Sequence, residues 1–246
     1  MKNNSESLVI GRNAVKEAIK SKRTIDTILV SNIKNKTLSD IFKQAKLSGI
    51  VVKEVDSKKL DMMSEGENHQ GIIAVSAVKE YSTIDDIFKL SEERGEPPFI
   101  LILDGIEDPH NLGAIIRTAE GAGVHGIIIP KRRSVGLTYS VGKASAGAIE
   151  HIHVARVFNI ASTIDELKKR GVWVYGTDMV GNLWCDTDMR GAVALVIGNE
   201  GKGISRLVKE KCDVLVSLPM KGKIQSLNAS VAAGIIMYEI ARQRSI

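Results

Sequence analysis

Short apolar runs alternate with amphipathic segments from residue 8 onward. In the first part of the chain the apolar runs TIDTILVS (24–31), IVVKEV (50–55) and QGIIAVSAV (70–78) predict β-strands. Between the first two lies TLSDIFKQAKLSG (37–49), whose apolar positions recur at helical spacing and whose Gly49 is suited to end a helix. The pattern predicts a compact α/β domain over residues 1–78.

A second, longer series of apolar runs begins at Phe99. These runs show no alternation of apolar and polar positions, as is typical of strands covered on both faces in a parallel sheet. They are FILIL (99–103), GIIIP (126–130), IHVARV (152–157), VWVYGT (172–177), AVALVIG (192–198) and DVLVSLP (213–219). Segments of helical character such as STIDELKKRG (162–171) lie between them. We therefore expect a parallel-sheet domain over residues 98–246, joined to the first domain by a charged linker, 79–97, that closes at Pro97 and Pro98.

The charge distribution divides the chain at similar places. Residues 1–60 carry a net charge of +7, residues 61–96 carry −6, and residues 97–246 carry +4. A basic amino-terminal domain fits a nucleic-acid partner, although solvated surface charge explains the same excess. Aromatic residues make up 4% of the chain, which argues against a base-stacking platform of the kind used by RNA-recognition domains.

Composition excludes several other classes. Two cysteines, Cys185 and Cys212, are too few for a disulfide framework and lack the spacing of a zinc or redox motif. No apolar run reaches the length of a membrane span, and the start of the chain lacks the apolar core of a secretory signal. We expect a cytoplasmic protein with no membrane partner.

Three polar, glycine-containing loops follow predicted strands, which is where ligands bind in parallel sheets. The first, DGIEDPHNLGAIIRTAE (104–120), opens a helix whose buried face carries a single arginine, Arg117. The second is VIGNEGKGIS (196–205), and the third, SLPMKGKIQSLNASVAAG (217–234), is expected to open a helix at Ser226. Together they hold asparagine amides, serine hydroxyls, an arginine and glutamate carboxylates but no nucleophile paired with a base, which favours a site that holds and orients its ligands.

Three other patterns do not fit the chemistry they suggest. GAGVHG (121–126) matches a dinucleotide fingerprint but follows a helix and precedes a strand, the reverse of the required order. GLTYSVGKA (136–144) resembles a phosphate-binding loop with one residue too many and no magnesium-binding hydroxyl. His151 and His153 would share a strand face, but no further ligand lies at a recognisable spacing, so we expect no metal site.

The three loops also carry motifs in a recognisable order. NLGAIIRTA (111–119), IGNEGKG (197–203) and LPM followed by SLNASVA (218–232) resemble motifs one, two and three of the SpoU, or TrmH, family of RNA ribose 2′-O-methyltransferases. The resemblance covers the whole chain. GRNAVKEA (11–18) and HQGI (69–72) resemble the bacterial branch that modifies a guanosine in the peptidyl-transferase region of 23S rRNA.

The resemblance implies a fold, a cofactor and a set of roles. The fold is an L30e-like, ribosomal-protein-like α/β domain followed by a SPOUT parallel-sheet domain with a trefoil knot, in a homodimer that binds S-adenosylmethionine. Carried over by position, the catalytic group is Arg117, Asn111, Glu200, Ser226 and Asn228. The cofactor contacts would be Thr177, Ile197, Gly198, Leu218 and Leu227. Candidate RNA contacts in the first domain are Arg12, Lys20, Lys22 and Arg23.

Alternatives stay open at this stage. The substrate would be ribosomal RNA, naked or in an assembling large subunit, but a transfer RNA fits the same motifs. A non-enzymatic ribosome-binding factor would use the basic domain alone, and a nicotinamide-dependent oxidoreductase would share the α/β pattern. Since an arginine stays protonated at neutral pH, Arg117 would clamp a phosphate and stabilise a developing alkoxide, while the group that first accepts the hydroxyl proton is not identified.

Overall fold

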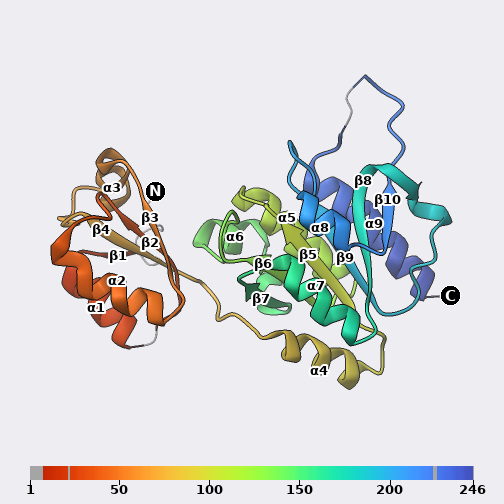
Figure 1. Ribbon diagram of the computed structural model, residues 1–246, viewed down its shortest axis with the longest axis horizontal. Coiled ribbons are helices and arrows are strands. Elements are labelled where there is room, and N and C mark those ends of the chain that lie inside the picture. The colour runs from red at the N-terminus through yellow and green to blue at the C-terminus, as the bar shows by residue number, and fades with distance from the viewer. Residues whose placement is uncertain (1–7, 22, 224–225, 246) are drawn as a thin grey trace. The chain divides into compact units, whose positions relative to one another are not determined.

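The computed structural model describes residues 8–21, 23–223 and 226–245. The chain divides into two compact units, one formed by residues up to Glu80 together with Gly136–Tyr139, the other by Tyr81–Val135 and the residues from Ser140 onward. Figure 1 shows the elements of both units. Within the described ranges, no helix is both long enough and apolar enough to cross a bilayer.

The first unit is built on a four-stranded sheet of order β1-β4-β2-β3. β4 pairs antiparallel with β1 and β2, whereas β2 and β3 are parallel. Its elements are β1 (Leu8–Ile10), α1 (Arg12–Lys20), β2 (Ile25–Val30), η2 (Lys36–Leu38), α2 (Ser39–Leu47), β3 (Val51–Glu54), α3 (Ser57–Ser64) and β4 (Ile72–Ser76). Ile28, Val30 and Ile72 are fully buried between sheet and helices, so this unit has a hydrophobic core of its own. The predicted α/β character is confirmed.

The second unit contains a six-stranded sheet of order β10-β8-β9-β5-β6-β7, parallel throughout. All six apolar runs form strands: β5 (Phe99–Asp104), β6 (Gly126–Pro130), β7 (His153–Val157), β8 (Trp173–Leu183), β9 (Val193–Gly198) and β10 (Val214–Ser217). The helices between them are α5 (Pro109–Gly121), α6 (Tyr139–Ala144), η3 (Ala148–Glu150), α7 (Ile160–Lys169), η4 (Trp184–Asp186) and α8 (Arg206–Lys211), and α9 (Ala229–Arg244) follows the last strand.

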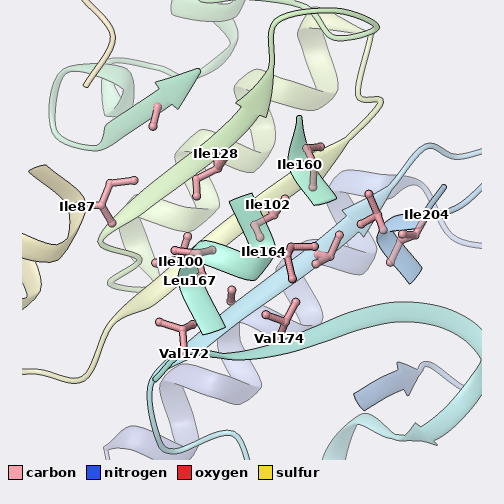
Figure 2. Packing of buried hydrophobic residues seen from close by; sticks show 14 residues of the cluster. Ile87, Ile100, Ile102, Ile128, Ile160, Ile164, Leu167, Val172, Val174 and Ile204 are labelled. Carbon is pink, nitrogen blue, oxygen red and sulfur yellow. The ribbon is translucent and has the colours of Figure 1, made fainter. Parts of the chain in front are cut away.

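Helices cover both faces of this sheet, which explains the uninterrupted apolar runs. Ile100 and Ile102 of β5 point to one face and pack with α7 and α8, as Figure 2 shows for the labelled members of this cluster. The intervening Leu101 and Leu103 are also fully buried, on the opposite face, where α5 and α9 lie against each other. In a central strand whose two faces are both covered, consecutive side chains are buried and are therefore apolar.

The segment 79–97, expected as a linker, contains a helix, α4 (Ile84–Arg94). Thr83 and Asp86 form a capping box at its start, and Gly95 ends it with a φ of 64°. Ile87 is fully buried in the core of the second unit, where its side chain would clash with any Cβ added at Gly126. The segment is therefore anchored to the second unit along its helical part.

The other end of the sheet is tied to the last helix. The guanidinium of Arg244 donates hydrogen bonds to the carbonyl oxygens of Pro97, Pro98 and Gly191 at 2.9, 2.9 and 2.6 Å. Burial is the largest influence on this group and lowers the pKa of Arg244 to about 10. The end of α9 is thereby fixed to the start of β5.

Candidate active site

The loop after β9 is a tight turn that approaches its own backbone. Asn199 and Gly203 exchange two backbone hydrogen bonds, of 3.1 and 2.7 Å, and Gly203 has a φ of 65° that favours glycine. A Cβ added to Gly198 would lie 2.2 Å from the carbonyl carbon of Gly203. Gly198 therefore allows the turn to close directly over the end of β9.

Asn199 joins this turn to the end of the neighbouring strand. Its side-chain oxygen accepts from the backbone N–H of Gly201 at 3.0 Å, and its amide nitrogen donates to the carbonyl oxygen of Gly105 at 2.9 Å. Ser205 N–H donates to the carboxylate of Asp104 at 2.7 Å in the same region. The loops after β5 and β9 are thus held together at the carboxyl edge of the sheet.

Glu200 is the centre of a polar network that connects all three motif loops. Its Oε1 accepts from Asn111 Nδ2 at 3.1 Å, from the backbone N–H of Ala229 at 3.2 Å, and from Asn228 Nδ2. Asn228 Nδ2 also donates to Asn111 Oδ1 at 2.9 Å. A carboxylate at the amino end of α9 is further stabilised by the helix dipole. Asn111, Glu200 and Asn228 are therefore brought together as expected.

Asn228 is the N-cap of α9, and this corrects the expected start of that helix. Its side-chain oxygen accepts from the backbone N–H groups of Ser230 and Val231, so the helix begins at Ala229. Ser226, expected to open the helix, lies three residues earlier in an exposed loop. The Asn228 side chain satisfies backbone N–H groups of the first turn, so the helix starts after Asn228 and not at Ser226.

A cavity of about 360 Å³ opens beside this network. All five residues expected to contact the cofactor line it: Thr177, Ile197, Gly198, Leu218 and Leu227. Glu200 and Ser226 line it as well, and Ala232 and Ile236 of α9 form part of the apolar wall. Its volume lies in the range typical of small-molecule sites, and the mixture of apolar side chains with glycine backbone is also typical.

Sequence reasoning missed Asp178, which lines the cavity next to Thr177. Lys209 forms an ion pair with its carboxylate at 2.6 Å. Burial opposes ionisation, but the hydrogen bond from Lys209 and those from the backbone outweigh it, so the pKa of Asp178 is lowered. The signal was available in part, because Asp178 directly follows a predicted strand in the same way as the three motif loops do.

Arg117 stands apart from this group. Its helix neighbours Leu112, Ile115, Ile116 and Ala119 are buried, as the sequence predicts. Arg117 itself is exposed and is not part of the cavity wall, and its side chain makes no hydrogen bond or ion pair with the residues that the structure describes. Its expected role at the reacting hydroxyl stays a prediction.

The basic residues predicted for RNA contact belong to the first unit. Arg12 donates to the backbone oxygen of Gln70 at 3.2 Å and Lys20 pairs with Glu17 at 2.8 Å, while Arg23 is exposed. Lys22 lies outside the described residues. No group of three metal-ligating side chains occurs in the described part of the chain, and His151 lies in the turn before β7 and not on it. The strand starts at His153, whose ring is hydrogen-bonded to Ser82, so the two histidines do not share a strand face.

The family models and the relatives that match this chain are all of RNA methyltransferases. Residues 98–238 match the model of the SpoU rRNA Methylase family, and residues 8–82 match a model described as RNA 2′-O ribose methyltransferase substrate binding. YacO of Bacillus subtilis (strain 168), assigned to the TrmH family of tRNA/rRNA methyltransferases, is 54% identical over 239 residues, which is 96% of each chain.

Solved structures give the same answer for the fold. The SpoU methyltransferase AviRb from Streptomyces viridochromogenes, in complex with AdoMet, superposes with a TM-score of 0.62 at 26% identity, covering 97% of this chain and 90% of that one. An AdoMet-bound rRNA methyltransferase from Sinorhizobium meliloti gives a TM-score of 0.60 at 27% identity, over 96% of this chain and 86% of its own.

Proposed function

Since the chain belongs to the SpoU rRNA methylase family, we propose that it transfers the methyl group of S-adenosylmethionine to a ribose 2′-hydroxyl of RNA. The observation that carries this is the cavity lined by Glu200, whose carboxylate is hydrogen-bonded to Asn111 and Asn228. Membership makes the chain an RNA methyltransferase. The ribose as acceptor is supported by the match of residues 8–82 to a substrate-binding model for 2′-O enzymes.

The cavity fits the cofactor in size and chemistry. Leu218, Leu227 and Ile236 provide apolar walls. Gly198 has no side chain, so its backbone lines the cavity directly. When bound, the cofactor supplies an activated methyl group on a sulfonium, whose positive charge disappears as the methyl leaves. An apolar wall that excludes water favours a reaction in which charge is lost.

The two carboxylate oxygens of Glu200 would have different roles. Oε1 receives the donors of Asn111, Asn228 and Ala229 and so fixes the loop before α9. Oε2 makes no hydrogen bond within the described residues, so it is available to the ribose. We expect Glu200→Gln to reduce turnover more than it reduces S-adenosylmethionine affinity.

Arg117 would hold a phosphate next to the target ribose and stabilise the alkoxide that forms as the hydroxyl attacks. Because its side chain makes no hydrogen bond or ion pair with the described residues of its own chain, we propose that it acts in a homodimer. α9 exposes Val231 and Tyr238 with 50% and 55% of their surfaces accessible, and α5 packs beside this helix, so a second copy has apolar surface to cover there.

For the substrate we propose a guanosine in the peptidyl-transferase region of 23S rRNA, in the cytoplasm. The motifs GRNAVKEA and HQGI and the charge of +7 over residues 1–60 support this choice. Transfer RNA is the second candidate, since relatives such as YacO are described for tRNA and rRNA together. A trefoil knot, and a boundary between RNA-binding and catalytic domains near residues 79–97, are part of the same proposal.

The test is transfer of labelled methyl from S-adenosylmethionine to ribosomal RNA that lacks its own 2′-O-methyl marks, with tRNA in parallel. Wild type should label one ribose, Arg117→Ala should lose the label, and Arg206→Ala should keep it, because Arg206 is an equally exposed arginine held by Glu210. A folded wild type that binds RNA without labelling rRNA, particle or tRNA would overturn the proposal in favour of a binding factor.

A further inference from the structure

A cluster of cations and one aromatic ring follows β6 and the neighbouring edge strand β7. Pro130 of β6 pairs with Val157 of β7. Directly after Pro130 come Lys131, Arg132 and Arg133, and directly after Val157 comes Phe158. The backbone N–H of Lys131 donates to the carbonyl oxygen of Val157 at 2.7 Å, so the two strand ends stay joined beyond the last ladder pair. Because the sheet is parallel, this cluster lies on the edge that also carries the cavity.

Direct contacts lead from this cluster to the candidate active site. Val135 N–H donates to the carbonyl oxygen of Ile106 at 3.0 Å, which attaches the basic segment to the loop after β5. The position of a Cβ on Gly105 in that loop would lie 4.0 Å from the carbonyl oxygen of Arg133 and 3.6 Å from Cβ of Asn199. Asn199 precedes Glu200, so the basic segment and the polar network border the same glycine.

The cations of this segment have no counter-ion among the residues that the structure describes. Arg132 and Arg133 are exposed, and with Lys131 they form no ion pair in the portion of the chain that the structure describes. Burial, followed by the charge of Arg156, lowers the pKa of Lys131, as expected for a cation that no carboxylate stabilises.

The acidic side chains of the adjoining loop do not neutralise them. Asp104 accepts from Ser205 N–H, and Asp108 caps α5 by accepting from His110 N–H. Glu107 is exposed and forms no ion pair with the described residues. Among the described residues, none of these three carboxylates is therefore paired with Lys131, Arg132 or Arg133.

Phe158 adds a different kind of surface. Its ring is 77% exposed, and the Lys131 ammonium lies 3.8 Å from the ring centroid. An exposed phenylalanine has no stabilising role in the core. A ring fixed beside cations is the usual combination in sites for single-stranded nucleic acid, where bases stack on aromatic faces and cations hold the backbone.

We propose that Lys131, Arg132, Arg133 and Phe158 form an RNA-binding surface that holds the nucleotides flanking the methylated ribose. The cations bind backbone phosphates, and Phe158 stacks on one unpaired base. This surface rests on the proposed function, since it gives the strand that enters the active site its position. It is separate from the basic residues of the first unit and lies within the unit that carries the cavity.

The experiment compares three variants with wild type: Arg132→Gln with Arg133→Gln, Phe158→Ala, and the control pair Lys89→Gln with Lys169→Gln. The control removes the same charge from exposed positions on α4 and α7 of the same unit. RNA affinity is measured by fluorescence anisotropy on an unmethylated transcript of the large-subunit rRNA over a series of salt concentrations. S-adenosylmethionine affinity is measured by calorimetry, and KM for RNA and kcat by methyl transfer.

The two test variants should fail in different ways. Loss of both arginines should lower the slope of log affinity against log salt by about 0.7 per lost cation and raise KM for RNA about tenfold or more. Phe158→Ala should weaken RNA binding by about tenfold and leave the salt slope unchanged, because stacking releases no counter-ions. Both should bind S-adenosylmethionine as wild type does, and the control pair should match wild type throughout.

If both test variants kept the RNA affinity and the salt slope of wild type, the proposed RNA-binding surface would be ruled out, whatever the enzyme's activity. Equal loss in the control pair would also overturn it, because the effect would then reflect net charge alone. Failure of the proposed function has a separate sign: wild type would transfer no methyl group to any RNA, while the salt slopes would still report whether the surface binds it.

Discussion

Gly198→Ala tests whether the close turn after β9 builds the cofactor cavity. The added Cβ would lie 2.2 Å from the carbonyl carbon of Gly203 and 2.3 Å from the backbone nitrogen of Ile204. Non-bonded carbon atoms prefer 3.5–4.0 Å, so the turn must move by on the order of 1 Å. Neither atom belongs to a flexible side chain, and both are held by the reciprocal hydrogen bonds between Asn199 and Gly203.

The cost follows from these contacts. Overpacking a rigid site destabilises by about 1–3 kcal/mol, and each weakened backbone hydrogen bond adds about 1 kcal/mol. A total of roughly 2–4 kcal/mol would lower Tm by roughly 5–15 °C in a unit of this size. The turn also lines the cavity, and only about 1.4 kcal/mol lost from the bound state weakens S-adenosylmethionine binding tenfold.

The assay is thermal unfolding with and without S-adenosylmethionine, together with calorimetric Kd. Gly201→Ala is the matched control, since it lies in the same loop and its added Cβ would meet only Asn199 Oδ1, at an ordinary 3.7 Å. A Gly198→Ala protein with wild-type Tm and Kd would refute the reasoning. Equal damage from Gly201→Ala would show that the loop tolerates an added Cβ at neither glycine, and that the close approach at Gly198 is not the cause.

Two further predictions concern titratable groups whose pKa is shifted mainly by burial. His125 is fully buried and accepts a hydrogen bond from the Phe99 N–H, and burial, its largest influence, lowers its pKa below the ordinary value. The folded state thus binds this proton less readily than the unfolded state, so the unfolding free energy should fall as pH drops below about 6.5. His125→Asn should flatten that decline in urea titrations between pH 7 and 5, whereas exposed His151→Gln should not. Burial raises the pKa of Cys212 to about 11, so iodoacetamide at pH 8 should label only exposed Cys185 in the native protein and both in denaturant, as mass spectrometry would show. Rapid native labelling of Cys212 would contradict this.

The strands of the second unit could be predicted because burial on both faces of the sheet requires runs of consecutive apolar residues. The buried positions of a strand covered on both faces, such as residues 99–103 of β5, are all apolar, and a run like FILIL has few other interpretations. The same logic placed the three polar loops at one edge of the sheet. The order of the strands in the sheet could not be predicted in this way. The apolar run of a strand shows that the strand is buried, but it does not show which other strand it pairs with.

Other features depended on contacts between distant residues. β8 continues to Leu183, past Gly181 and Asn182, because β10 pairs with this extension through Val216 and Ser217. Glycine and asparagine within a run indicate a turn when read alone. Similarly, the bond from Asn228 to Asn111 spans 117 positions, and only the resemblance to a family, not periodicity, placed these two amides in one site.

The position of α9 sets an order of events during synthesis. Asn228 completes the polar network, and Ala232 and Ile236 of the same helix close one wall of the cavity. Chains fold progressively as they leave the ribosome, and the first unit has its own core and can form early. The cofactor cavity exists only after residue 236 has emerged, so a nascent chain still attached at that point can present its basic first unit to RNA well before it can bind a methyl donor.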